Sequence, residues 1–414
     1  MADNLNLKKW RRLCYVQAFF GVETFTAPIL VLFYTRYAGF TFTSYSLLMS
    51  LIGIFLWFFE VPTGAFADRF GRKLSLITGN CIYLVALACL LCFKNEASIF
   101  LLAGLFALGG SLSSGPFQSM MYQSFAAAEQ EATYHTIVAR GTSVSLFGAA
   151  IAAALGGVLA EYSISLPMVI DMIALVIVTF FLALNLPNVA PISHTENLEE
   201  HHIKSFYAIL VAGVKQTFAS RALMVTILLS AVSFACLRAG FNFYQPMLSE
   251  HSVPLYEIGL LFSVFLLLSS GVAYLFSHSK KTFITSKVPI LLMACLISIS
   301  AISAYLTYIT TIVIAIICHQ IVRGMSPSYF SYSINREIHQ TTKSRTTILS
   351  VASLMSAISA SAMMYGAGVI AESIGFSQAF VLLSVVSAIL LIIGFIFLGA
   401  KNEVLETQVS TIRD

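Results

Sequence analysis

The chain has 414 residues, of which 58% are hydrophobic and only 10% are charged. About a quarter of the residues in a soluble protein are charged, so a soluble fold of this composition would expose a large apolar surface. The net charge of +4 is spread over short segments rather than gathered on one face, which argues against a nucleic-acid-binding protein.

Apolar runs long enough to cross a bilayer follow one another along the whole chain. Each spanning helix needs about 20 apolar residues. The predicted spans cover residues 14–37, 43–63, 74–93, 99–122, 135–160, 166–186, 222–248, 256–276, 288–308, 310–335, 346–371 and 376–398. The first run resembles a signal peptide, but it is too long, carries Glu23 and lacks a small-x-small cleavage site. We therefore predict an all-α integral membrane protein with twelve transmembrane helices.

A polar segment, residues 187–205, separates the first six spans from the last six, and residues 206–220 favour an amphipathic surface helix. We predict a six-helix bundle over 1–186, a cytoplasmic linker over 187–221, and a second six-helix bundle with a short tail over 222–414. This internal duplication is typical of two-bundle secondary transporters. The seven cysteines lie in apolar runs, where we expect packing roles and no metal site.

Lysine and arginine are distributed unevenly between alternate loops. If the N-terminus is inside, 19 of the 23 basic residues lie on the cytoplasmic side. Arg36 and Lys94 lie outside, and Arg238 and Arg323 lie within spans. Because cytoplasmic loops of membrane proteins are enriched in Lys and Arg, we expect both termini in the cytoplasm. The expected location is the cytoplasmic (inner) membrane of a bacterium.

The loop between the second and third spans carries the most specific motif, with the sequence GAFADRFGRK over residues 64–73. Two glycines allow a tight turn and close helix approach, and three basic residues hold the loop beside anionic lipid. An aspartate in this loop can face a helix N-terminus or a neighbouring cation. The predicted gating loop consists of Gly64, Asp68, Arg69, Gly71, Arg72 and Lys73.

This loop resembles the G-x-x-x-D-R-x-G-R-K motif of the major facilitator superfamily at every defining position. The resemblance implies two six-helix bundles, a central cavity lined by the first, fourth, seventh and tenth helices, and a latch between the bundles at Asp68. The corresponding loop of the second half, 277–281, keeps the basic charge but has no aspartate. Glu60 and Arg140 lie near the cytoplasmic ends of their spans and are possible gate partners of the loop.

Charged residues at mid-membrane cost about 2.5–3.5 kcal/mol each, and three stand out here: Glu23, Arg238 and Arg323. They fall on three of the four helices that the resemblance assigns to the cavity. Polar residues share a helix face with two of them or with one another on the fourth span: Arg238 with Asn242 and Gln245, Arg323 with His319, and Ser114 with Gln118 and Tyr122. The pair Gly115-Pro116 favours a kink in the fourth span. The predicted substrate cavity comprises Ser114, Gln118, Tyr122, Arg238, Asn242, Gln245, His319 and Arg323. We interpret Glu23 as the proton-coupling site, and a structural Glu–Arg ion pair is the alternative.

The leading functional hypothesis is a secondary transporter that moves a small organic solute by alternating access, with proton-coupled efflux of a drug or metabolite. Four glycines in the fifth span partly resemble the antiporter motif of drug exporters, which favours export, although the Gly-Pro pair of that motif and the arginine often found in the fourth span are missing. The two cavity arginines instead favour an anionic metabolite, for example a carboxylate siderophore, taken up or exported.

Two other classes of membrane protein are alternatives to a transporter. A membrane-embedded enzyme would need a catalytic motif, and the spans contain no H-E-x-x-H, no G-x-S-x-G and no paired aspartates. A sensor or scaffold that does not transport is the remaining alternative. No phosphate-binding loop is present, so we expect no nucleotide cofactor, and indeed no cofactor. The expected partners are the solute, protons and the lipid bilayer, and we expect a monomer.

Overall fold

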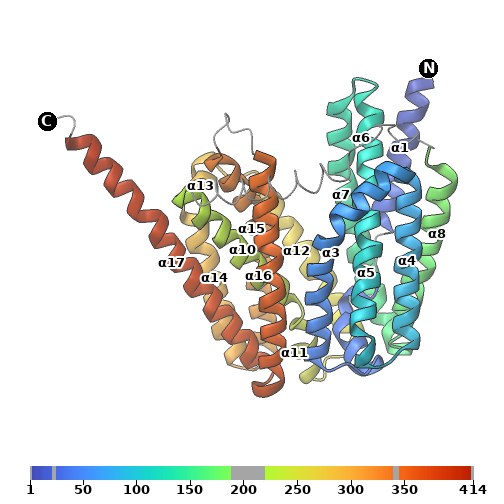
Figure 1. The fold of residues 1–414 in the computed structure, drawn as a ribbon. Helices are drawn as coiled ribbons and strands as arrows, with labels where there is room; N and C mark the ends of the chain where they lie inside the picture. Colours follow the sequence, from blue (N-terminus) through green and yellow to red (C-terminus); the bar gives the residue numbers. More distant parts are fainter. Residues whose placement is uncertain (1, 21–24, 188–219, 339–344, 412–414) are drawn as a thin grey trace. The chain divides into compact units, whose positions relative to one another are not determined.

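The structure is a computed structural model that describes residues 2–20, 25–187, 220–338 and 345–411, and these residues form helices and turns without a strand (Figure 1). The predicted linker and surface helix fall mainly on residues 188–219, outside the described residues. The elements in chain order are α1 (Ala2–Phe19), η1 (Ala27–Ile29), α2 (Leu30–Leu32), η2 (Phe33–Tyr37), α3 (Phe42–Phe70), α4 (Arg72–Cys92), η3 (Glu96–Ser98), α5 (Ile99–Ser114), α6 (Pro116–Ala126), α7 (Glu131–Tyr162), α8 (Leu166–Asn185), α10 (Arg221–Phe241), α11 (Tyr244–Glu250), α12 (Leu255–Ser277), α13 (Lys281–Thr285), α14 (Val288–Tyr305), α15 (Ile309–Glu337), α16 (Arg345–Ile374) and α17 (Phe376–Thr411).

Within the described residues, 11 helical segments are long and apolar enough to cross a membrane. They correspond to the second to twelfth predicted spans. The first predicted span, 14–37, has no single counterpart because α1 ends at Phe19 and the helical residues that follow the undescribed segment 21–24 begin at Ala27. The all-helical membrane fold is confirmed, and the first span is built from several shorter pieces.

The fourth predicted span is interrupted at Gly115, where α5 ends and α6 begins with Pro116. Proline has no amide hydrogen, so it leaves the carbonyl four residues earlier without its helical donor. That carbonyl belongs to Leu112, and it accepts a hydrogen bond of 2.9 Å from the Ser75 hydroxyl of α4 instead. The side chain from a neighbouring helix therefore satisfies the backbone group that the proline frees, as a membrane interior requires.

The seventh predicted span is also divided, although its pattern predicts one helix over 222–248. α10 closes with tight turns, in which the amides of Asn242 and Phe243 donate to carbonyls three residues back, at 3.1 and 3.0 Å. α11 then begins at Tyr244. Pro246 lies in the first turn of α11, where the missing amide has no helical partner to lose. The interruption therefore lies inside an apolar run, and no charged residue marks its position in the sequence.

The chain divides into two compact units, one spanning Met1–Glu196 and Leu248–Leu267 and the other spanning Asn197–Met247 and Leu268–Asp414. In the first unit, a buried cluster joins the middle of α1 and the starts of α4 and α7 to α6 and the end of α8, through residues such as Trp10, Leu76 and Phe125. In the second, Leu223, Ile334 and Ile348 join the start of α10, the end of α15 and the start of α16. Both clusters lie at helix ends that the sequence assigns to the cytoplasmic side.

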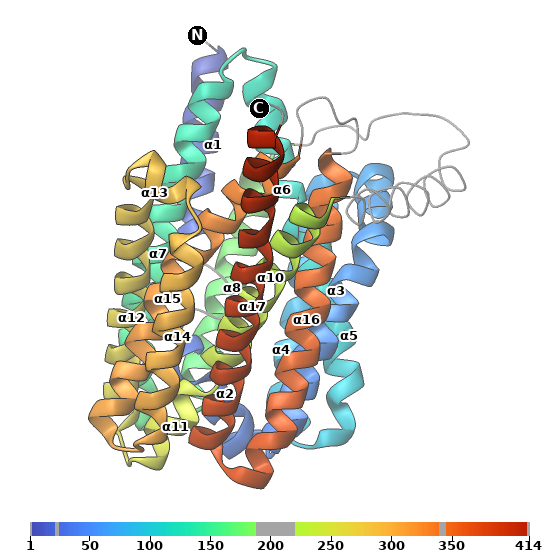
Figure 2. The same cartoon turned by 90° about the vertical axis from the view of Figure 1, so that its left-hand side faces the viewer.

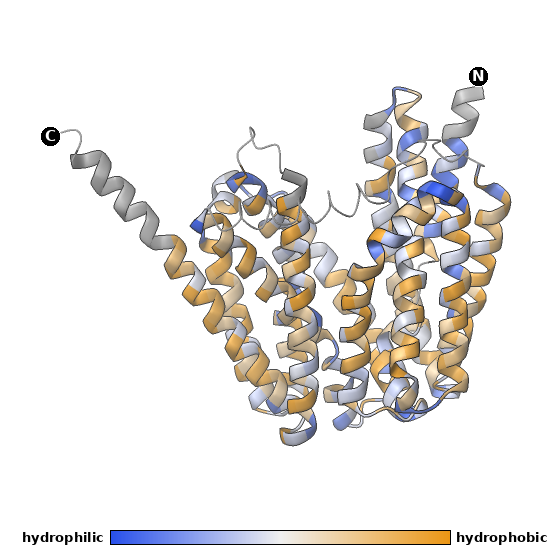
Figure 3. Ribbon diagram, in the orientation of Figure 1, coloured by the Kyte–Doolittle hydropathy of each residue, from blue (hydrophilic) through white to orange (hydrophobic). Residues whose placement is uncertain are grey.

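The outer faces of the long helices are apolar. Side chains such as Phe100, Phe180 and Ile302 are more than 60% exposed, which suits contact with lipid better than contact with water. Hydrophobic residues dominate the helices of each unit, and hydrophilic residues collect at helix ends, including the turn between α3 and α4 (Figure 3). Figure 2 shows the same helices from another side. The bilayer is thus the solvent in which this surface is stable.

Candidate functional site

The second unit contains a buried polar cluster centred on His319 of α15, which has no exposed surface. The Tyr244 hydroxyl of α11 is hydrogen-bonded to His319 Nδ1, and the Cys236 sulfur of α10 lies 3.6 Å from His319 Nε2. Both ring nitrogens of the imidazole therefore have partners, as buried polar groups require. A Cβ at Gly240 would lie 2.5 Å from the imidazole carbon Cε1, so glycine is needed there to admit the ring.

Arg323 lies one turn after His319 on α15 and is only partly buried. Its guanidinium stacks over the Phe241 ring, with the carbon Cζ 4.8 Å from the ring centroid, a favourable cation–π arrangement. The Nη1 nitrogen, however, is buried and has no hydrogen-bond partner among the described residues. A buried charged donor without a partner is costly, so this nitrogen marks the place where an acceptor is missing.

Arg238 of α10 adds a second positive charge to this region. Its side chain is exposed, and α10 packs against α15, which carries Arg323. Neither residues 222–249 nor residues 309–336 contain an aspartate or glutamate. α10 therefore supplies no carboxylate to neutralise the arginines, and the one carboxylate of α15, Glu337, is the last residue of that helix. An anionic ligand would supply both the missing negative charge and the missing hydrogen-bond acceptor.

The polar residues predicted on the seventh span lie on both sides of the break between α10 and α11. Asn242 donates to the Arg238 carbonyl at 2.9 Å and lies against the Met364 sulfur at 3.2 Å, so its amide closes α10. Gln245, on α11, is 1% exposed, whereas Arg238 is exposed. A shared cavity face for Arg238, Asn242 and Gln245 therefore stays a prediction.

Three residues missed in the predicted cavity belong to this cluster. Tyr244 and Cys236 bind the two sides of the imidazole, and Gln320 has a buried side-chain oxygen without a partner in the described part of the chain. Gln320 was detectable as a polar residue in an apolar run next to His319. The contacts of Tyr244 and Cys236 were not detectable, because they depend on the break after Phe241.

The cavity residues predicted on the fourth span lie in the first unit, around the break between α5 and α6. Ser114 donates to the Ser111 carbonyl of its own helix at 3.2 Å. Gln118 is exposed, and Tyr122 is 42% exposed with its ring 5.2 Å from that of Tyr134 on α7. The helix is interrupted at Gly115-Pro116, Ser114 and Gln118 lie beside this break, and Tyr122 lies further along α6.

Asp171 of α8 anchors the first predicted span. The carboxylate is 3% exposed and accepts hydrogen bonds from the amides of Phe25 and Thr26, at 3.1 and 2.9 Å, and from the Thr26 hydroxyl at 2.6 Å. Free amides at the start of a helical segment attract an anion. Glu23, the predicted proton-coupling residue, lies outside the described residues, two positions before this anchor.

The predicted gating loop is mostly helical, because α3 continues to Phe70, α4 begins at Arg72, and Gly71 alone forms the turn between them. Gly71 has a φ of +94°, which L side chains rarely adopt, and its amide donates to the Ala67 carbonyl at 3.0 Å. The expected close approach is absent at Gly64, because a Cβ there would meet nothing within 4 Å. Lys73 donates to the Leu186 carbonyl at 2.9 Å and so ties this turn to the end of α8.

The other charged residues of the gating loop are less enclosed. Asp68 and Arg69 are exposed and Arg72 is partly exposed. Glu60 is exposed on α3, and Arg140 is exposed on α7. In the described part of the chain, no ion pair joins Arg140 to Asp68 or Glu60. Their roles in a gate therefore stay predictions.

Glycines of the fifth predicted span, α7, pack against the first. A Cβ at Gly141 would lie 3.0 Å from the Cys14 sulfur, and one at Gly148 would lie 2.8 Å from the Phe19 carbonyl oxygen. A Cβ at Gly156 would collide with the Phe25 carbonyl, and one at Gly157 would lie 2.6 Å from the Leu255 carbonyl oxygen of α12. Small residues that allow such close approach are typical of helix interfaces in membranes, so packing accounts for all four glycines.

Long apolar helices, interrupted at polar clusters, define a multi-pass membrane protein of the solute-carrier class. The profile of the Major Facilitator Superfamily matches residues 13–342. The chain belongs to this superfamily, whose members are transporters rather than enzymes.

The similarity to individual proteins is more distant. An uncharacterized MFS-type transporter of Bacillus subtilis (strain 168), YxaM, is 24% identical over 241 residues, and the match spans 58% of this chain and 58% of that protein. A mutant of the nucleoside transporter NupG superposes with a TM-score of 0.74 at 15% identity, over 96% of this chain and 99% of that one. A bacterial homologue of the human lysosomal transporter Spinster gives a TM-score of 0.70 at 15% identity, over 96% of both chains. These structures share the fold.

Proposed function

We propose that this transporter carries a small organic anion across the membrane by alternating access, and that Arg323 and Arg238 bind the anion. The observation that carries the proposal is the buried Nη1 nitrogen of Arg323, which has no acceptor among the described residues. Arginine presents a planar fork of donors that matches a carboxylate or phosphate. A solute carrying such a group supplies the missing acceptor and the missing negative charge together.

An anion fits this region better than a cation. A cationic drug would meet two like charges on helices that carry no carboxylate at this level, and like charges at close range repel strongly in a medium of low dielectric constant. The stacking of Arg323 on Phe241 holds the guanidinium in one orientation, which lowers the entropy lost when a ligand binds. His319 and Tyr244, which are hydrogen-bonded to each other, add buried polar groups one turn from Arg323.

We further propose that Glu23 couples transport to protons and that the direction is export. The anchoring of Phe25 and Thr26 by Asp171 supports the first point, because it fixes the chain directly after Glu23. The glycine pattern of α7 favours export, although close packing against neighbouring segments also accounts for these glycines. A sensor that binds the same anion without moving it is the competing function.

Ligand-induced stabilisation of the purified protein tests the choice of solute class. A ligand at 100 times its dissociation constant stabilises the folded state by about 2.7 kcal/mol, which raises the melting temperature measurably. A panel of organic anions, zwitterions and cations of matched size is applied to the wild type, to Arg323→Gln, and to Arg336→Gln, a control at the end of the same helix. We expect anions to stabilise the wild type and the control but not Arg323→Gln. Stabilisation by cations alone contradicts the proposal.

A further inference from the structure

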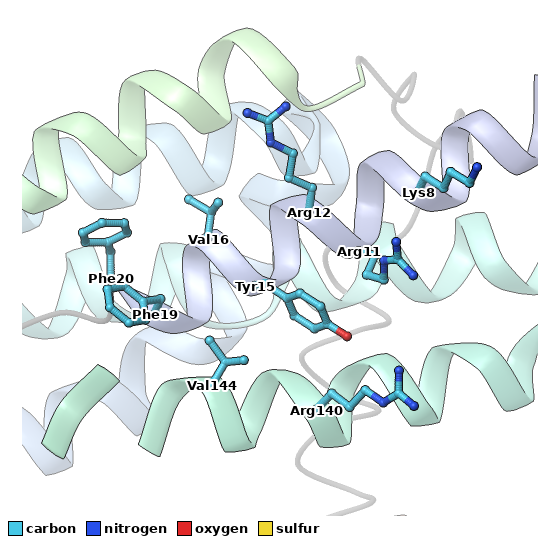
Figure 4. A pocket seen from close by; sticks show the side chains of 9 residues that line it. All are labelled: Lys8, Arg11, Arg12, Tyr15, Val16, Phe19, Phe20, Arg140 and Val144. Atoms are coloured by element: carbon cyan, nitrogen blue, oxygen red, sulfur yellow. The ribbon is translucent and has the colours of Figure 1, made fainter. Parts of the chain in front are cut away.

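A groove of about 720 Å³ lies between α1 and α7 in the first unit, away from the polar cluster around His319 (Figure 4). The proposed transport mechanism does not use it. Its walls come from one face of α1, on which Lys8, Arg11, Tyr15 and Phe19 follow one another at helical spacing. Arg140 and Val144, one turn apart, complete it from α7.

The groove changes in character along its length. Lys8, Arg11 and Arg140 lie at one end, and Phe19 and Phe20 lie at the other, with Tyr15 between them (Figure 4). From Lys8 to Phe19 the helix rises by about 16 Å, at 1.5 Å per residue. Half of a bilayer's hydrocarbon core is about 15 Å thick. The groove thus has a basic end and an apolar end, and the distance between them is about the thickness of one leaflet.

Its charge is unbalanced. Four of the described lining residues are basic and none is acidic. Arg12 is stacked on the Phe181 ring of α8, with Cζ 5.7 Å from the centroid, and its side chain points away from the others (Figure 4). Lys8, Arg11 and Arg140 form no ion pair with any side chain that the structure describes. These three cations are therefore available to an external anion.

The shape of the groove is fixed by backbone packing rather than by flexible side chains. Cys14 and Phe19 of α1 lie against Gly141 and Gly148 of α7, and a Cβ at either glycine would meet them at 3.0 Å or less. The two helices are consequently held together below the groove along two turns. A preformed groove of this kind binds a ligand with little loss of conformational entropy.

We propose that this groove binds one anionic diacyl phospholipid, with the phosphate between Arg11 and Arg140 and one acyl chain along Tyr15, Val144 and Phe19. Basic pockets between transmembrane helices favour anionic headgroups. The apolar end of the groove would make no favourable contact with a free inorganic anion. The length, the polarity gradient and the uncompensated charge all match a lipid of one leaflet. The site would make the protein's stability depend on the headgroup charge of the membrane.

Native mass spectrometry of the full-length protein tests the site. The protein is released from detergent after incubation with equal amounts of phosphatidylglycerol and phosphatidylcholine, and the bound lipid is counted. We expect the wild type to retain phosphatidylglycerol preferentially. Removal of each cation weakens binding by about fivefold, so Arg11→Gln combined with Arg140→Gln should lower the preference by at least tenfold.

Matched variants separate the groove from general surface charge. Lys9→Gln with Lys280→Gln removes the same charge from exposed positions outside the groove and should keep the preference. Arg11→Lys with Arg140→Lys keeps the charge and should retain most of it, which excludes misfolding as the cause of a loss. Equal losses in the Lys9 and Arg11 pairs overturn the proposal. Displacement of the lipid by millimolar inorganic phosphate also overturns the proposal, because the site would then bind only the headgroup and the apolar end of the groove would have no role.

Discussion

His319 and Arg323 lie one turn apart on α15 but differ in whether their nitrogen atoms have hydrogen-bond partners. The imidazole has a partner on each nitrogen, whereas the guanidinium has an aromatic face beneath it and a buried nitrogen that finds no acceptor in the described residues. We interpret His319 as the fixed part of the site and Arg323 as the part that meets the solute. The sequence identified both residues, because an ionisable side chain in an apolar span is conspicuous.

Loss of the Tyr244 hydroxyl should destabilise the second unit. In Tyr244→Phe the buried Nδ1 of His319 keeps its desolvation cost and loses its partner, which is worth about 1–3 kcal/mol. Cys236→Ala removes a weaker sulfur contact and should cost less than about 1 kcal/mol. The melting temperatures of the two variants in the same detergent check this order. A larger loss for Cys236→Ala would mean that the sulfur contact, rather than the phenol, holds the ring.

Asp171 should be more important for stability than an ordinary polar residue of a span. Asp171→Asn replaces one accepting oxygen by a donor that faces the Thr26 amide and hydroxyl, at a cost of about 2–3 kcal/mol for charged hydrogen bonds. Thr26→Val removes only the hydroxyl and should cost about 1 kcal/mol. Thermal unfolding of both variants tests the graded loss, and equal effects would contradict an anchor made chiefly by the backbone amides.

At the scale of elements, the spans were predictable but their interruptions were only partly so. Gly115-Pro116 marks one break, because proline cannot continue the hydrogen-bond ladder. The break at Asn242 has no such mark, since the proline that accompanies it, Pro246, lies four residues later and is tolerated at the start of α11. Helical periodicity could not be extended across that break. The hydrogen bond between Tyr244 and His319, which depends on the break, was accordingly not predicted.

The two glycines of the gating loop should respond differently to alanine. Gly71→Ala places a Cβ on a backbone with φ +94°, a conformation nearly confined to glycine, and should cost about 1–3 kcal/mol. Gly64→Ala meets no atom within 4 Å and should be neutral or stabilising by up to about 1 kcal/mol, because alanine favours a helix interior. Melting temperatures of both variants provide the test, and a loss at Gly64 would point to a close approach in another state of the transporter.

At the scale of the whole molecule, composition and the spacing of apolar runs predict the membrane fold, because each span must satisfy its own backbone. The motif at residues 64–73 predicted the superfamily, which the match over residues 13–342 confirms. Direction of transport, coupling and solute depend instead on a few side chains and on the movement between states, and no periodic pattern encodes these.

Proton coupling can be separated from binding with one substitution. Glu23→Gln removes the proposed proton carrier but keeps the size and polarity of the side chain. We expect solute exchange at equal pH to persist in proteoliposomes while accumulation driven by a pH gradient is abolished. Glu257→Gln, an exposed carboxylate near the start of α12, serves as the control. Normal gradient-driven accumulation in Glu23→Gln would assign the coupling to another group.

The central claim, that Arg323 and Arg238 bind an organic anion in transit, is tested most directly by flux measurements in proteoliposomes. The solute is the anion that stabilises the wild type most strongly. Because a hydrogen bond to a charged group is worth about 1.5–3 kcal/mol, we predict that Arg323→Gln raises the KM for exchange by about 10- to 100-fold. Arg238→Gln should raise it less, since that side chain is exposed, and Arg336→Gln should leave it unchanged. An unaltered KM in Arg323→Gln, with flux intact, would contradict the account.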